Sequence, residues 1–195
     1  GIQIELMPEA VCFLGLEIGV EHLSAVEIDL AAKVKRARLL PFDGRDAGVA
    51  DAVAQALRLA LDGMDACRLD ACEGIGIAIP GQMDRDGRLR LAPLLGWRNI
   101  DIADHARQAL PVPLPVMAEN DANAFAIGAG YGQRRGQGGV SLVINMESGV
   151  GAGILIDGFD DVTIVNGVIA EFDYGVLLNP GSTRNLIAEL DLQLN

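Results

Sequence analysis

The composition describes an acidic, globular chain. Half of the 195 residues are apolar, which is enough to bury a sizeable core in one domain or two small lobes. The net charge of −12 opposes binding to a phosphate backbone, no apolar run approaches the roughly 20 residues of a membrane-spanning helix, and no basic-then-apolar leader opens the chain, so we expect a cytoplasmic protein.

The first part of the chain predicts a three-stranded meander. Segments 11–20, 22–30 and 33–40 have the composition of strands, with turns at Gly19 to Glu21 and near Asp29 to Ala32. After a break at Pro41 to Gly48, apolar residues recur at three- and four-residue steps over 49–64. This spacing predicts a helix that packs on the sheet.

The middle of the chain adds a further series of elements. Segment 73–81 is apolar at almost every position, which predicts a central strand buried on both faces. The pair Asp86-Gly87 favours a tight turn. We then expect a short helix near 101–110 and a strand over 114–120.

The last part begins with a helix at about residue 121. Strands over 138–146 and 151–158 follow as a pair, and 184–190 has the apolar spacing of a helix. The pattern alone indicates an α/β fold, and the order of the elements is that of the ribonuclease-H-like fold, a mixed sheet with flanking helices. We place a first lobe at 1–119 and the start of a second at 120–195.

Three stretches resemble successive signatures of the ROK family, which contains repressors, open reading frames and sugar kinases. They are "GIAIPGQMD…G…LAPLLGWRNIDI", "LPVMAENDANAFAIG" and "GVGAGILIDG", in matching order over roughly residues 11–175. The resemblance implies a two-lobed, actin-like ATPase scaffold with a sugar in the cleft and glycine turns around the ATP phosphates. Because ROK proteins usually continue well beyond the equivalent of residue 195, we expect a shortened second lobe.

The resemblance places Asp121 at the position of the catalytic base. A base must lie within hydrogen-bond reach of the sugar hydroxyl, and the end of a strand can hold it rigidly. Asn120 and Glu171 would correspond to ligands of the sugar hydroxyls. The alternative is that Asp121 only caps the helix that follows, and the two roles are compatible.

The two phosphate turns depart from the kinase pattern. The first reads "EIGVEH" at 17–22, where the kinases carry a sequence like D-I-G-G-T-K, and the second reads "ESGVG" at 147–151 in place of one like G-T-G-x-G. The residues concerned are Glu17, Gly19, Glu21, Glu147, Ser148, Gly149 and Gly151. A carboxylate about 4 Å from a phosphate oxygen costs several kcal/mol in a partly dry cleft, so we expect no ordinary ATP binding unless Glu21 and Glu147 point to solvent. The alternative for Gly149 and Gly151 is that they serve only a tight turn and do not contact a phosphate.

No metal site is predicted. Tyr174 stands where ROK proteins commonly carry a histidine, and the cysteine-rich zinc loop that usually follows is missing, so we expect no structural zinc. His22 and His105 are not spaced as ligands, and Trp97 is a minor candidate for an apolar wall beside the sugar, with core packing as the alternative. The three cysteines form no C-x-x-C pair and are expected to be buried or incidental thiols: Cys12, Cys67 and Cys72.

Three functions follow from these patterns. Our first hypothesis is the sugar-binding effector domain of a ROK-type transcriptional regulator, a pseudokinase that forms a homodimer, uses no cofactor and reaches DNA only through a head upstream of Gly1. The second is a sugar (hexose) kinase that uses Mg-ATP, with Asp121 as base. The third is a non-catalytic oligomerisation scaffold. The sequence does not identify the sugar, because side-chain placement decides which hydroxyls are recognised.

Overall fold

The structure is a computed structural model. It describes residues 5–64, 66–133, 139–146, 150–157, 163–164, 167–170, 176–178, 186–187 and 190–193. Our predictions for residues 147–149, 171 and 174 lie outside these ranges.

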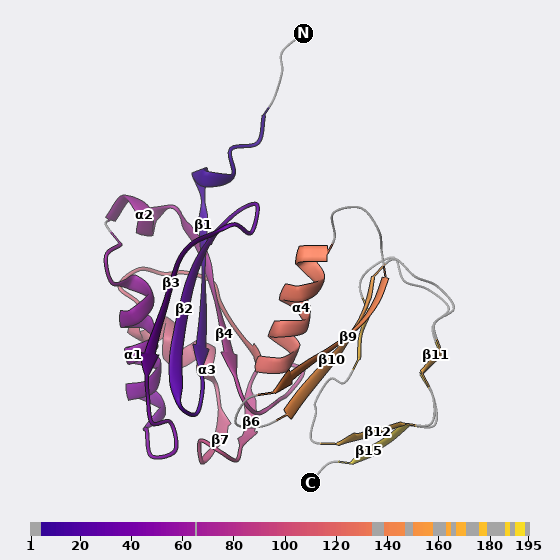
Figure 1. Cartoon of the computed structure of the whole chain (residues 1–195). Coiled ribbons are helices and arrows are strands. Elements are labelled where there is room, and N and C mark those ends of the chain that lie inside the picture. The colour runs from indigo at the N-terminus through magenta and orange to yellow at the C-terminus, as the bar shows by residue number, and fades with distance from the viewer. Residues whose placement is uncertain are drawn as a thin grey trace.

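A mixed five-stranded sheet forms the centre of the molecule (Figure 1). Its order is β3 (Val34–Pro41), β2 (His22–Asp29), β1 (Cys12–Ile18), β4 (Cys72–Ile79) and β8 (Val116–Asn120). The pairs β1–β2 and β2–β3 are antiparallel, whereas β1–β4 and β4–β8 are parallel. The predicted meander and the predicted ribonuclease-H-like topology are confirmed.

Two helices cover one face of this sheet. Helix α1 (Val49–Leu61) packs on β1, β2 and β3, and α3 (Ile102–Ala109) packs on β8 and α1. The buried residues of α1 recur at helical spacing, as predicted: Ala52, Val53, Ala56, Leu57 and Ala60. The strands turn every second residue toward these helices, so β1 and β2 alternate between buried and half-buried positions.

Strand β4 is central, as predicted, but only one of its faces is fully buried. Ile75, Ile77 and Ile79 lie in the core, whereas Glu73 and Gly76 are exposed. The apolar run misled the prediction because glycine and alanine occupy the second face of the strand. These small residues do not need burial in the way that isoleucine does.

Several short elements lie between the long ones. A small sheet of β5 (Gln82–Met83), β6 (Leu89–Ala92) and β7 (Trp97–Ile100) was not predicted, although the turn at Gly87, with φ of +74°, was. A 3-10 helix, η1 (Pro8–Ala10), precedes β1, and α2 (Ala66–Asp70) precedes β4.

Helix α4 (Asp121–Gln133) leads into a second sheet, which it contacts through β9 (Gly139–Met146) and β10 (Val150–Asp157). These two strands pair antiparallel, as predicted, and β13 (Val176–Leu178) pairs parallel with β10. The division of the chain into lobes at residue 119 stays a prediction. None of the helices in the described ranges is long and apolar enough to cross a membrane.

Two further strand pairs correct the helix that we predicted over 184–190. Strand β11 (Thr163–Ile164) pairs with β14 (Leu186–Ile187), and β12 (Gly167–Ala170) pairs with β15 (Leu190–Gln193). Three apolar residues at helical spacing are too few to distinguish a helix from two short strands.

Candidate functional site

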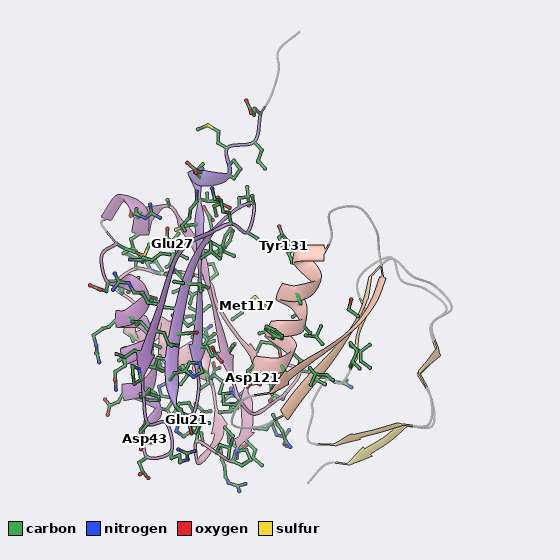
Figure 2. The ribbon with its side chains drawn as sticks, in the orientation of Figure 1. Glu21, Glu27, Asp43, Met117, Asp121 and Tyr131 are labelled. Atoms are coloured by element: carbon green, nitrogen blue, oxygen red, sulfur yellow. The ribbon has the colours of Figure 1, made fainter. Side chains whose placement is uncertain are left out.

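The predicted sugar residues lie at the carboxyl ends of the parallel strands. In the sheet register Glu17 pairs with Ala78 and Ile79 pairs with Asn120, so the ends of β1, β4 and β8 meet at one edge. Asp121 is the first residue of α4 and follows β8 without a loop. Figure 2 shows Asp121 and Glu21 toward this same end of the molecule. Carboxyl ends of parallel strands are a common place for ligand sites in α/β folds.

Asn120, rather than Asp121, caps helix α4. Its side-chain oxygen accepts the amide hydrogen of Asn123 at 3.0 Å, which is the bond of a helix N-cap. Its side-chain nitrogen donates to the carbonyl of Gly81 at 2.9 Å and ties β8 to the loop after β4. The Asn120 side chain also acts on the neighbouring Asp121 carboxyl, whose pKa it lowers in part.

Asp121 lies in a half-buried, acidic environment. Its Oδ1 accepts the amide hydrogen of Ala122 at 2.8 Å. Burial raises the pKa of the Asp121 carboxyl above its usual range, and the negative charge of Glu17 raises it further. A raised pKa is a common property of a carboxylate that accepts a proton or binds a hydroxyl.

Two residues that the sequence analysis did not single out support this arrangement. An added Cβ at Gly81 would lie 2.7 Å from the carbonyl oxygen of Leu91, so only glycine fits there. The side-chain amide of Asn123 donates to Glu119 at 3.1 Å. Both lie inside the quoted motifs, but neither their contacts nor their roles follow from residue type.

The first phosphate turn is closed by bonds within itself. The amide of Gly19 donates to the carbonyl of His22 at 3.0 Å. One carboxylate oxygen of Glu17 accepts from the Ser24 hydroxyl at 3.0 Å and lies 3.2 Å from His22 Nε2. Ser24 was not predicted, because only the register of β1 and β2 brings it opposite Glu17.

Glu21 points to solvent. Its side chain is 66% exposed and its Oε1 lies 3.3 Å from Arg45 Nη2. The alternative that we left open for this residue is therefore the one observed, and Glu21 does not line the turn as a repelling carboxylate.

Most of the remaining candidate residues that lie in the described ranges have a role in packing rather than in the site. Trp97 is 5% exposed and donates through Nε1 to the carbonyl of Ala47 at 3.0 Å, so it packs in the core rather than forming a wall of the site. Within the described ranges no group of three or more His, Cys, Asp or Glu side chains could hold a metal ion. Gly151 lies in β10 opposite Asn145, and the other second-turn residues, Glu147, Ser148 and Gly149, lie outside the described residues together with Glu171.

The site has the groups to bind a polyol and one group that could accept a proton. Asp121 supplies a carboxylate acceptor, and the side-chain amide of Asn120 lies beside it. A sugar hydroxyl both donates and accepts hydrogen bonds, so it suits such a mixed set.

This chain belongs to the ROK family. The model of that family matches residues 13–172. The ribonuclease-H-like, actin-like fold predicted from the sequence is the fold of its ROK structural neighbours.

The relatives include both kinases and repressors. The chain is 28% identical over 173 residues to a glucokinase of Halalkalibacterium halodurans, covering 87% of this chain and 51% of that protein. It is 33% identical over 85 residues to the xylose repressor of Bacillus subtilis, covering 43% of this chain and 21% of that protein.

A solved ROK family glucokinase from Streptomyces griseus, in complex with glucose and AMPPNP, superposes with a TM-score of 0.63 at 28% identity, covering 75% of this chain and 45% of that one. The chain thus spans about half the length of the glucokinases that it matches. Since both classes are represented, the preference for the repressor branch stays a prediction.

Proposed function

We propose that this chain is the sugar-binding effector part of a ROK-type transcriptional regulator and that it does not phosphorylate its sugar. In this proposal the sugar contacts Asp121 and Asn120 at the carboxyl ends of the parallel strands, with Glu171 as a further ligand. Sugar binding would shift the population of lobe arrangements, by no more than its difference in affinity for the two states.

The closed first phosphate turn is the observation that carries the proposal. A phosphate-binding turn offers free backbone amides to the phosphate oxygens. Here the amide of Gly19 is already bonded to the carbonyl of His22, and one carboxylate oxygen of Glu17 is engaged by Ser24 and His22. Opening this turn for a nucleotide would break these bonds.

The half-buried carboxylate of Asp121 supports sugar recognition. Because Asn120 supplies the helix cap, Asp121 is not required for that purpose. The relatives support the same class of ligand, since a glucokinase acts on glucose and one solved relative holds glucose.

DNA binding, in this proposal, belongs to a segment outside these 195 residues. The net charge of −12 opposes contact with phosphates over most of the surface. A homodimer, as expected from the sequence, would present two such segments to a two-fold operator.

Calorimetry with separate ligands tests the proposal. We expect binding heat with glucose or xylose, loss of that heat in Asp121→Asn, and no heat with magnesium and AMPPNP. The variant Asp70→Asn is the matched control, because Asp70 is an exposed aspartate on α2, and it should bind the sugar like the wild type. Absence of heat with every ligand would favour the oligomerisation scaffold.

A working sugar kinase is the second candidate, because the glucokinase match covers 87% of the chain whereas the xylose repressor match covers 43%. Asp121 would then be the general base, with its raised pKa suited to taking a proton from the sugar hydroxyl. A coupled assay for ADP release across hexoses decides between the two. Sugar-dependent turnover that Asp121→Asn abolishes would replace the effector proposal with the kinase.

A further inference from the structure

Two of the three cysteines lie next to each other in the central sheet. Strands β1 and β4 pair in parallel, and their first residues, Cys12 and Cys72, are partners in the register. Both are buried, with exposed fractions of 7% and 5%, so the prediction of buried thiols is confirmed for these two. The candidate sugar site lies at the other ends of the same strands, so the cysteine pair is separate from it.

A β-bulge brings the two cysteine side chains to the same face of the sheet. The pairing shifts by one residue after Cys12, which leaves Glu73 of β4 as the extra residue. Because side chains alternate along a regular strand, Cys72 would otherwise lie on the opposite face from Ile75. With the extra residue, both Cys72 and Ile75 lie on the buried face, which is also the face of Cys12.

The two thiols are within reach of each other. Neighbouring strands lie about 4.8 Å apart, which is inside the range of roughly 4.4–6.8 Å between the Cα atoms of a disulfide. Burial raises the pKa of the Cys12 thiol, and the charge of the Cys72 thiol and a side-chain hydrogen bond with it raise that pKa further. Such a hydrogen bond requires that the two sulfur atoms lie close together, so a bond between them needs little movement of the strands.

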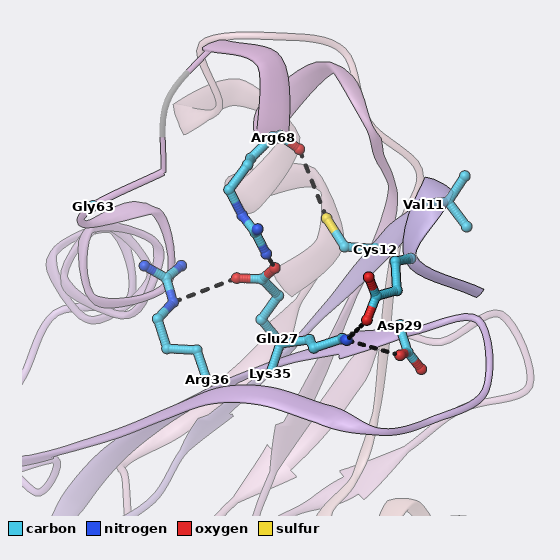
Figure 3. A pocket seen from close by; sticks show the side chains of 9 residues that line it. Val11, Cys12, Glu27, Asp29, Lys35, Arg36, Gly63 and Arg68 are labelled. Atoms are coloured by element: carbon cyan, nitrogen blue, oxygen red, sulfur yellow. Dashed lines mark hydrogen bonds and ion pairs between the residues drawn. The ribbon is translucent and has the colours of Figure 1, made fainter. Parts of the chain in front are cut away.

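A cavity gives small molecules access to Cys12. It has a volume of about 540 Å³ and lies between β2, β3 and α2, and Cys12 is among the residues that line it (Figure 3). The Cys12 thiol donates to the carbonyl of Arg68 at 3.7 Å, and the Cys72 thiol donates to the carbonyl of Gly74 at the same distance. Thiols are weak donors, so the loss of both thiol hydrogens costs little.

We propose that Cys12 and Cys72 form a disulfide when the protein is exposed to a peroxide. The Cys12 thiolate attacks one oxygen of hydrogen peroxide, the O–O bond breaks and hydroxide leaves, which gives a sulfenic acid at Cys12. The Cys72 thiolate then attacks the Cys12 sulfur, the S–S bond forms and a second hydroxide leaves. The two thiols lose two electrons, and their two protons combine with the hydroxides, so the peroxide is reduced to two molecules of water.

The buried position of Cys12 makes this reaction slow at neutral pH. Only the thiolate attacks, and the raised pKa of Cys12 keeps the thiolate rare. Below that pKa the thiolate fraction, and with it the rate, rises about tenfold for each pH unit. The pair therefore responds to sustained rather than brief exposure to peroxide.

Peptide mapping after peroxide treatment tests the proposal, which does not depend on the proposed function. The folded protein is treated with hydrogen peroxide at about pH 8.5, the usual pKa of a thiol, and the remaining thiols are then alkylated in denaturant. We expect a peptide pair linked through Cys12 and Cys72, a loss of two hydrogens from the intact mass, and reversal by dithiothreitol. A link through Cys67, sulfinic acid at Cys12 without a link, or no oxidation of Cys12 would overturn the proposal.

Two variants separate this pair from the third cysteine. Cys67→Ser should still form the link, and its oxidised form should melt several degrees above its reduced form, because the bond constrains the unfolded chain between residues 12 and 72. Cys72→Ala should form no link, and its Cys12 sulfenic acid should react with dimedone instead. An equal gain in melting temperature on oxidation of Cys72→Ala would show that this disulfide is not the cause, and would count against the pair.

Discussion

Two neighbouring residues, Asn120 and Asp121, divide the roles of helix cap and ligand group. Asn120 accepts from the amide of Asn123 and so begins α4, which leaves the Asp121 carboxylate at the surface of the site. The cost of this placement is electrostatic, because the carboxylate is half-buried and faces the charge of Glu17. Sites that hold such groups often trade stability for function.

The replacement Asp121→Asn should therefore raise the melting temperature at pH 7 by a few degrees. The folded state raises the pKa of this carboxyl, so it binds the proton more tightly than the unfolded chain does. Stability is then lost as the pH rises from the unfolded pKa of about 3.9 through the higher folded pKa, and asparagine avoids that loss.

Thermal unfolding at pH 7 and at a pH about two units below the unfolded pKa measures the effect. The advantage of Asp121→Asn should disappear in acid, where the wild-type carboxyl is protonated in both states. Asp70→Asn on α2 should show no comparable gain. A melting temperature of Asp121→Asn below that of the wild type at pH 7 would show that the charge is stabilising.

Gly81 and Gly76 should respond oppositely to alanine. A Cβ at Gly81 would meet the Leu91 carbonyl oxygen at 2.7 Å and Leu89 Cδ1 at 2.8 Å, so Gly81→Ala should lower the free energy of unfolding by about 2 kcal/mol. A Cβ at Gly76 meets nothing within 4 Å, so Gly76→Ala should be neutral or slightly stabilising. Urea midpoints compare the two, and equal losses would contradict the steric account.

At the scale of elements, the cap of α4 lies where strand β8 of the first sheet passes into the helix that contacts the second sheet. Asn120→Ala removes both the acceptor for the Asn123 amide and the donor to Gly81, and it should lower the free energy of unfolding by about 1–2 kcal/mol. Asn120→Asp keeps the acceptor and should lose less at low pH, where the new carboxyl is neutral. Equal losses in both variants by urea unfolding at low pH would show that the cap is not the important contact.

The long elements could be predicted from the sequence because their apolar spacing extends over several periods. Strands β1 and β2 alternate over seven and eight residues, and α1 keeps one stripe over thirteen. Strands β5, β6 and β7 have two to four residues each, which is too short for a period to be recognised. The exposed face of β4 was missed because glycine and alanine look apolar without being buried.

The candidate site could be predicted only in part, for a related reason. The motif placed Asn120 and Asp121 at a strand end, where the structure has them. The bond between Glu17 and Ser24 depends on strand register, and the exposure of Glu21 depends on the direction of one side chain. Neither the strand register nor the side-chain direction can be predicted from the residue type.

At the scale of the whole molecule, the chain is strongly acidic, while among the described residues three cations lie around Glu27. Lys35, Arg36 and Arg68 are paired there with carboxylates, so most of the net charge of −12 lies elsewhere. Exposed charges repel over distances that salt screens, with a Debye length of about 10 Å at 0.1 M, whereas buried pairs are screened much less. Added salt should therefore relieve repulsion more than it weakens the ion pairs.

We expect the melting temperature at pH 7 to rise by a few degrees between about 10 and 300 mM sodium chloride, because screening lowers the self-repulsion of the compact state. The control is a titration near pH 4.4, the isoelectric point, where the net charge vanishes and the same salt series should have little effect. A melting temperature that falls with salt at pH 7 would mean that the ion pairs around Glu27 dominate. In that case Arg68→Gln should remove most of the salt dependence, because Arg68 is the most exposed of the cations paired with Glu27 and Asp29.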